Sequence, residues 1–230
     1  MSDLIVYVDG YNLFHGLRHK FLDDRYQWLD LVSLAQRLRP RDNLIKVNYY
    51  TAPLQGASSA VRRQQDYLGA LRAVGGKVLA VHEARYQPKT ITCKCGRAWR
   101  SYEEKETDVH LAVDLVADIA TRSADSALVV SGDSDLCPAV RRAREFNAAA
   151  HIAMAFPPKR VSTELRALCP RSFVIGPGRI KDAQLPDRVE DPATGRVYER
   201  PVGWRPATAG LSSTVPASRK EAPQPHGHPC

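Results

Sequence analysis

Short runs of apolar residues alternate with longer amphipathic stretches along the first three quarters of the chain. The short runs have the length of buried strands, and apolar residues spaced three and four positions apart are typical of helices. This alternation predicts an α/β fold in which helices cover both faces of a mostly parallel central sheet, a three-layer α/β/α sandwich. Strands are expected near residues 4–9, 44–50, 77–82, 127–131, 149–155 and 172–175, and helices near 29–38, 58–74, 107–121, 135–146 and 162–168.

The pattern changes after residue 176. The apolar periodicity fades there, and more than half of the 16 prolines of the chain follow. We therefore expect one domain over residues 1–176 and a Pro-rich C-terminal extension over 177–230. Tyr198 and Trp204 give the extension something to bury, so its first part, to about residue 205, is expected to pack on the domain. The remainder is expected to be disordered.

Composition narrows the class of protein. A chain of 230 residues with 43% hydrophobic content can bury one substantial core. No apolar run approaches the ~20 residues that span a bilayer, and the N-terminus lacks the pattern of a secretory signal. The five cysteines lie far apart except for Cys93 and Cys95, which is not the pattern of a disulfide framework, so reduced thiols and a cytoplasmic location are expected.

The charge of the chain favours a polyanionic partner. The net charge is +8 and the pI is about 9.4. A basic surface raises the local concentration of nucleic acid and speeds its encounter. On charge alone, a soluble basic protein without such a partner is the alternative interpretation.

Carboxylates follow two of the expected strands. Asp9 comes directly after the apolar run at residues 4–8, and Asp133 and Asp135 follow the run at 127–130. In open α/β sheets the carboxyl ends of the strands form the crevice in which ligands bind. The two strands are therefore expected to bring three carboxylates to one edge of the sheet.

Asp108 adds a fourth carboxylate, because it lies in the first turn of the helix expected at 107–121. Aspartate also caps helices and stabilises their N-termini, which gives Asp9, Asp108, Asp133 and Asp135 an ordinary alternative role. Capping has to be assumed independently at each of these positions, so it explains the set of four less simply than one shared site does. Converging carboxylates repel one another unless a cation compensates, and oxygen ligands favour Mg²⁺ or Mn²⁺ over zinc. Such an ion suits the hydrolysis of phosphodiester bonds.

Three short motifs occur in order along the chain: VDGYN at residues 8–12, KETD at 105–108 and SGDSD at 131–135. In this order and at this spacing they resemble the NYN domains, the branch of the PIN-like nuclease superfamily that includes the LabA-like bacterial proteins. The resemblance covers roughly residues 3–176. It implies a PIN-like α/β sandwich and a metal-dependent ribonuclease that hydrolyses RNA.

The resemblance also assigns roles to individual residues. It implies that Asp9, Asp108 and Asp133 bind the metal, with Asp135 as a further ligand and Asn12 orienting water or substrate. These five residues form the expected catalytic set. Beside this set, Ser131 has the position to hydrogen-bond a ligand carboxylate, although a plain turn serine is the alternative. Lys105 is a candidate contact to an RNA phosphate, with a solvated lysine as its alternative.

An insertion at residues 86–102 separates the third expected strand from Asp108. Cys93 and Cys95 in it look like half of a structural zinc site, but no second pair of ligands is evident. Arg97, Trp99 and Arg100 form a basic, aromatic stretch that suits single-stranded RNA, because bases stack on aromatic faces and phosphates meet cations. An ordinary β-hairpin with a buried tryptophan is the alternative. Arg62, on the helix expected at 58–74, is a further candidate RNA contact, although Arg62 and its neighbour Arg63 point to different helix faces.

Two other functions compete with the ribonuclease. One is a non-catalytic RNA-binding or regulatory scaffold whose acidic pocket binds a metal. The other is a phosphatase of the haloacid dehalogenase type, in which a second aspartate usually follows the first by two residues; Tyr11 occupies that place here. A homodimer remains a hypothesis.

Overall fold

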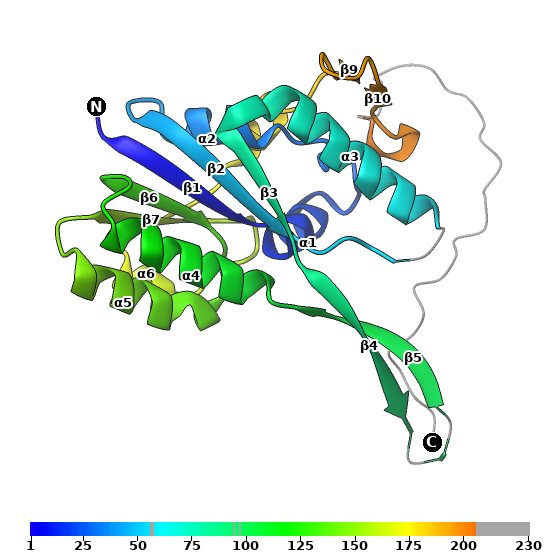
Figure 1. The fold of residues 1–230 in the computed structure, drawn as a ribbon, viewed down its shortest axis with the longest axis horizontal. Helices are drawn as coiled ribbons and strands as arrows, with labels where there is room; N and C mark the ends of the chain where they lie inside the picture. The colour runs from blue at the N-terminus through cyan, green and yellow to red at the C-terminus, as the bar shows by residue number, and fades with distance from the viewer. Residues whose placement is uncertain (56–57, 94, 97, 206–230) are drawn as a thin grey trace.

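The computed structural model describes residues 1–55, 58–93, 95–96 and 98–205 of the chain. A six-stranded sheet with the strand order β3-β2-β1-β6-β7-β8 forms the centre of the fold (Figure 1). Every neighbouring pair in it is parallel, which confirms the sheet expected from the sequence. Its strands are β1 (Asp3–Asp9), β2 (Asn43–Thr51), β3 (Leu79–Glu83), β6 (Ser126–Val130), β7 (His151–Phe156) and β8 (Phe173–Val174).

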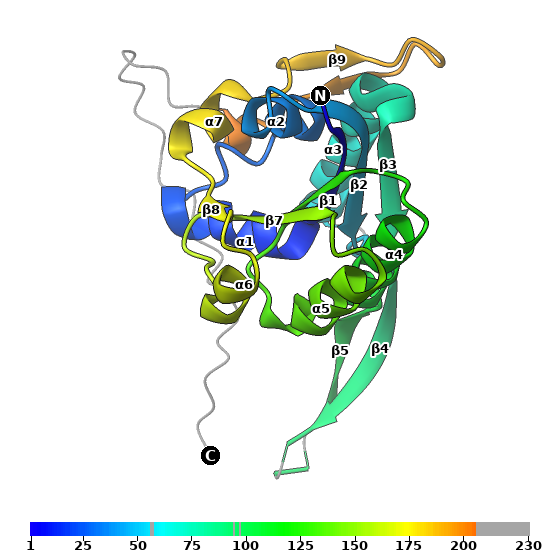
Figure 2. The same cartoon turned by 90° about the vertical axis from the view of Figure 1, so that its left-hand side faces the viewer.

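Helices cover both faces of this sheet, so the fold has three layers (Figure 2). Alternate residues of β1 face the two layers: Val6 packs into one apolar cluster, and Tyr7 packs into the other. Each fully buried apolar side chain contributes about 1.5–3 kcal/mol to folding. One face carries α1 (Gly10–Phe21), α2 (Leu31–Leu38), α3 (Ser59–Gly75) and α7 (Pro177–Asp182); the other carries α4 (Thr107–Ala120), α5 (Cys137–Phe146) and α6 (Thr163–Leu168).

Helix α1 was not among the helices expected from the sequence. It begins directly after β1, with the Asp9 carboxylate capping its first turn, and it contains Gly16 in its interior. A glycine disfavours a helix by about 1 kcal/mol relative to alanine. Here it is required, because a Cβ on Gly16 would lie 2.7 Å from Cβ of Pro157. Tertiary packing therefore outweighs local helix propensity in this segment.

The insertion at residues 86–102 forms most of an antiparallel ribbon, so the backbone of the expected β-hairpin is present, whereas the side chain of Trp99 is outside the described part. Its strands are β4 (Arg85–Thr92) and β5 (Ala98–Lys105), and their backbones pair from Arg85 with Lys105 to Thr92 with Ala98. The ribbon projects from the sandwich in both views (Figures 1 and 2). Because β5 leads into α4, the base of the ribbon lies two residues before Thr107, the first residue of that helix.

The C-terminal extension completes one of the two apolar clusters. Ile180 and Trp204 are buried in the same cluster as α1, α2 and α3. The Trp28 ring donates from Nε1 to the carbonyl oxygen of Pro186 at 2.7 Å and lies 6.3 Å from the Trp204 ring, centroid to centroid. Residues of the extension as far as Trp204 thus contact the domain, and the residues after 205, for which disorder is expected, fall outside the described part of the chain. The remaining elements are η1 (Gly76–Val78), η2 (Ser134–Leu136), β9 (Arg188–Glu190), β10 (Val197–Glu199) and η3 (Val202–Trp204).

None of the helices in the described part of the chain is both long enough and apolar enough to cross a membrane.

Candidate functional site

Asp9 occupies the carboxyl end of the central strand β1 and is 5% exposed. Its Oδ1 accepts a hydrogen bond of 2.9 Å from the backbone N–H of Asn12, and its Oδ2 accepts one of 2.8 Å from the Ser131 hydroxyl. The contact that the sequence suggested for Ser131 is therefore confirmed. Both carboxylate oxygens are held in place, and each retains a lone pair for another partner.

A second set of bonds ties the first turn of α1 to the loop after β6. The side-chain oxygen of buried Asn12 accepts from the N–H of Gly132 at 3.0 Å. The Ser131 Oγ also accepts from the N–H of Asp133 at 3.1 Å. Asn12 therefore connects the start of α1, which Asp9 caps, to the loop that carries Asp133, a positioning contact that its position in the VDGYN motif did not reveal.

The surroundings of Asp9 raise the pKa of its carboxyl group from an ordinary value to about 7. Burial is the largest cause, and the negative charges of Asp108 and Asp133 add to it. The hydrogen bonds from Asn12 and Ser131 act in the opposite direction, because they favour the charged form. The carboxylates of three separate motifs thus lie close enough to affect one another, as expected for one edge of the sheet.

These carboxylates nevertheless do not form a ready set of metal ligands. Among the described residues, no group of three or more His, Cys, Asp or Glu side chains could hold a metal ion as they stand, so the preformed cluster expected from the sequence is not found. Asp108 lies exposed in the first turn of α4, and Asp135 lies exposed in η2. Asp133 caps η2, because its side chain accepts a hydrogen bond of 3.0 Å from the N–H of Asp135. The alternative role as a helix cap is therefore present at this position.

Arg160 is a cation at this edge that the sequence did not single out. It follows β7, and its backbone approaches the loop after β6 so closely that a Cβ on Gly132 would lie 2.4 Å from the Arg160 carbonyl oxygen. Its Nε is buried and makes no hydrogen bond among the described residues. Burial and, next, the charge of Arg160 lower the pKa of His15 on α1. The signal available in the sequence was its position shortly after the apolar run of β7, another strand that ends at this edge.

Helix α4, which carries Asp108, is fixed to the sheet by two tyrosines. The Tyr7 hydroxyl donates to Oδ2 of Asp118, and the Tyr50 hydroxyl donates to Oδ2 of Asp114, both at 2.8 Å. Burial, followed by these bonds, raises the pKa of both phenols. These carboxylates therefore serve to position α4, and with it the first turn that contains Asp108.

The remaining candidates from the sequence are dispersed. Arg62 is exposed on α3, whereas its neighbour Arg63 lines a cavity. Arg97 falls outside the described residues. The backbone N–H of Cys95 donates to Sγ of Cys93 at 3.5 Å, and in the part of the chain that is described no third metal-binding side chain joins this pair. Trp99, Arg100 and Lys105 lie on β5, and their side chains are likewise not among the described parts.

Comparisons with known proteins agree with this architecture. The profile of the family described as "NYN domain" matches residues 3–176. A 6-hydroxy-3-succinoylpyridine 3-monooxygenase, HspA, from Pseudomonas putida (strain DSM 28022 / S16) is 27% identical over 174 residues, which are 60% of this chain and 54% of that protein. The chain thus spans about half the length of this curated relative. A crystal structure of a protein of unknown function from Vibrio parahaemolyticus RIMD 2210633 matches with a TM-score of 0.56 and 17% identity, over 80% of this chain and 96% of that one, which is a likeness of fold.

Proposed function

Because this chain belongs to the NYN domain family, we propose that it is a metal-dependent ribonuclease that hydrolyses RNA phosphodiester bonds at the edge of the sheet around Asp9. The family itself indicates a nuclease-like function related to RNA. The finer proposal rests mainly on Asp9, at the end of the central strand, where burial and, to a smaller extent, the negative field of Asp108 and Asp133 raise the pKa of the carboxyl group. A cation is the simplest compensation for such a field.

The donor chemistry fits a hard divalent ion. Asp9, Asp108 and Asp133 offer only carboxylate oxygens, the ligands preferred by Mg²⁺ and Mn²⁺. In the proposed site these three residues hold the ion, and Asp135 from the adjoining turn is a further donor. When bound, the ion supplies polarisation of the phosphoryl oxygen and activation of a water molecule.

The residues of the chain do the positioning. The Ser131 hydroxyl and the Asn12 N–H fix the two oxygens of Asp9 and favour its ionised form. Arg160 lies at the same edge, with a buried Nε that has no partner among the described residues. A guanidinium in such a place suits a phosphate oxygen, with which it forms charge-assisted hydrogen bonds. Asn12 holds the loop after β6 against the start of α1 through its hydrogen bond with Gly132.

The decisive experiment incubates the purified full chain with mixed RNAs and Mn²⁺ or Mg²⁺, with and without a chelator. We expect cleavage that the chelator abolishes and that falls by at least 100-fold in Asp9→Asn and Asp133→Asn. Glu145→Gln, which removes an exposed carboxylate on α5, is the control. RNA patterns that are the same for the wild type and both aspartate variants remove the ribonuclease proposal; retained affinity for RNA then favours the regulatory scaffold.

The assignment to the LabA-like branch and the cytoplasmic location are part of the same proposal.

The monooxygenase named among the relatives supports a second candidate, an oxygenase of a hydroxylated pyridine. Such a reaction also consumes O₂ and two electrons from a reductant. The test mixes the full chain with 6-hydroxy-3-succinoylpyridine and a reduced nicotinamide or reduced flavin in air. Oxidation of the reductant that depends on the pyridine would support this candidate, and its absence would remove it.

A further inference from the structure

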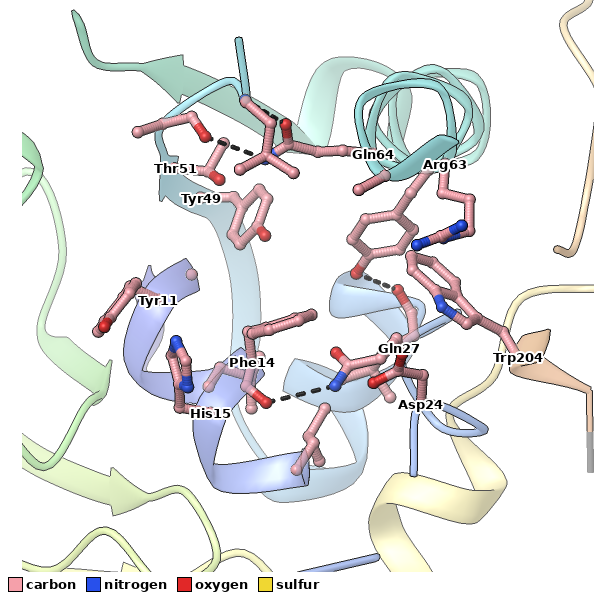
Figure 3. A pocket seen from close by; sticks show the side chains of 18 residues that line it. Tyr11, Phe14, His15, Asp24, Gln27, Tyr49, Thr51, Arg63, Gln64 and Trp204 are labelled. Carbon is pink, nitrogen blue, oxygen red and sulfur yellow. Dashed lines mark hydrogen bonds between the residues drawn. The ribbon is translucent and has the colours of Figure 1, made fainter. Parts of the chain in front are cut away.

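A cavity of about 220 Å³ opens beside the candidate site, between α1, the end of β2, α3 and the C-terminal Trp204 (Figure 3). It is partly open to solvent, and Gly10 and Tyr11 form part of its wall. These two residues follow Asp9 directly in the chain. Part of the cavity wall is therefore continuous in the chain with the residue at which we propose cleavage.

The walls of this cavity are largely aromatic. Phe14, Tyr49, Tyr67 and Trp204 line it, and the Tyr67 and Trp204 rings meet edge to face at a centroid distance of 6.0 Å. Tyr11, at the side nearest Asp9, is 57% exposed. Aromatic faces that line a cavity bind flat rings by stacking, largely without regard to which ring is present. The lining thus favours a planar, uncharged ring system.

Polar groups with fixed orientations interrupt the aromatic wall. The side-chain amide of Gln64 accepts from the N–H of Leu54 and donates to the carbonyl oxygen of Ala52. The amide of Gln27, a residue that is 5% exposed, donates to the carbonyl oxygen of Phe14 at 3.3 Å. Each amide has two donor hydrogens and two acceptor lone pairs, so both retain capacity for a ligand. Such groups recognise the hydrogen-bonding edge of a heterocycle, which a purely hydrocarbon ligand does not have.

The size of the cavity and the charge of its lining restrict the class of ligand further. The volume is below the ~300–1,000 Å³ typical of sites for drug-sized molecules, so it suits one ring system with part of its substituent. Arg63 lines the cavity and lies beside Trp204 in Figure 3. A cation there suits a phosphate attached to the bound ring. The chain as a whole carries +8, which favours a polyanion.

We propose that this cavity binds one base of the RNA, turned out of the strand, so that the adjoining phosphodiester lies at Asp9. This inference rests on the proposed ribonuclease function and adds a recognition site to it. The base stacks between the aromatic walls, its edge meets Gln27 and Gln64, and Arg63 faces the backbone. Recognition of unstacked bases in this manner is how proteins commonly read single-stranded RNA.

The test uses RNA in which 2-aminopurine, a fluorescent base, replaces one position at a time, bound to the full chain in the presence of a chelator. We expect strong quenching at one position only, next to the bond that is cut when Mn²⁺ is added. Ala60→Phe, which places a ring in the cavity from α3, should abolish this quenching and raise the KM for RNA by at least 10-fold. It should leave the kcat for an oligonucleotide that is abasic at that position unchanged.

Two further comparisons guard against a general loss of structure. Arg63→Gln should weaken binding by about 5-fold, whereas Arg37→Gln should not. The two arginines are matched, because each donates to a serine four residues earlier on its helix, Ser59 and Ser33 respectively. Ala120→Phe, on the exposed end of α4, is the control for the added ring.

The outcomes separate this inference from the function on which it rests. Position-specific quenching without any cleavage would overturn the ribonuclease and keep the base site. Cleavage with uniform quenching at all positions, or with Ala60→Phe behaving as Ala120→Phe does, would overturn the base site and keep the ribonuclease. Displacement of the fluorescent RNA by a free hydroxypyridine but not by nucleoside monophosphates would also overturn it, in favour of a small heterocycle.

Discussion

The Ser131 hydroxyl donates a hydrogen bond of 2.8 Å to Oδ2 of Asp9, although the two residues are 122 positions apart in the sequence. The contact arises because β1 and β6 are parallel neighbours in register, Val8 pairing with Val130, so that the residues following both strands meet at the same edge. Ser131 thus fixes one oxygen of the residue at the centre of the candidate site and favours its charged form.

Replacing Ser131 with alanine should therefore impair catalysis without unfolding the protein. The loss of a group that orients a metal ligand typically costs 10–100-fold, and we expect about 10-fold in kcat. The hydrogen bond lowers the pKa of Asp9, so its removal should move the acidic limb of the pH–rate profile to higher pH. Ser134→Ala, in the same turn, is the control. A fall in rate at an unchanged pH profile would argue against this role of Ser131.

Asp9→Asn should stabilise the metal-free protein at neutral and alkaline pH. The folded-state pKa of about 7 lies above the unfolded value near 4, so the folded wild type binds the proton more tightly. The stability of the wild type should consequently fall as the pH rises from about 4 to about 7 and stay level above that. We expect Asp9→Asn to be more stable by ~2–4 kcal/mol at pH 8 and to show a smaller advantage at pH 5. Urea unfolding in a chelator measures this, and an advantage that does not grow with pH would contradict it.

Arg160→Met should reduce kcat/KM for RNA by about 100-fold through the loss of a cation at the phosphate, and Arg160→Lys should restore part of it. Methionine keeps much of the apolar stem, so the fold should be retained. Arg142→Met, which removes an exposed cation paired with Glu145, is the control for net charge. Steady-state kinetics at two salt concentrations give the comparison. Equal losses of kcat/KM in the Arg160 and Arg142 variants would mean that Arg160 acts only through the net charge of the protein.

The C-terminal extension should prove necessary for stability, even though the family match ends at residue 176. Ile180 is completely buried, so Ile180→Ala should lower the free energy of unfolding by ~2–4 kcal/mol. Val202, in the same extension, is 81% exposed, and Val202→Ala should change the free energy of unfolding by less than about 0.5 kcal/mol. Denaturant unfolding of the two variants provides the measurement. Similar values for both would mean that the extension adds little to the core.

The sequence by itself determined the order of the parallel strands along the chain and the carboxylates at their ends. Each of the six expected strands appears within about two residues of its place, because a short apolar run between turns is a local signal that depends on few neighbours. The same signal identified Asp9 and Asp133 as residues leaving a buried strand. Their convergence with Asp108 at one edge then followed from the general geometry of open parallel sheets.

The tertiary structure decided the features that local sequence patterns cannot predict. Helix α1 forms despite Gly16, because that glycine lets the helix approach Pro157. The backbone of Arg160 approaches the loop after β6 closely only because Gly132 has no side chain, and the walls of the cavity come from Phe14, Tyr67 and Trp204, which lie far apart along the chain. The reason is physical: secondary-structure propensity and capping act over a few residues, whereas close packing, burial and the field at Asp9 depend on which distant segments the fold brings into contact.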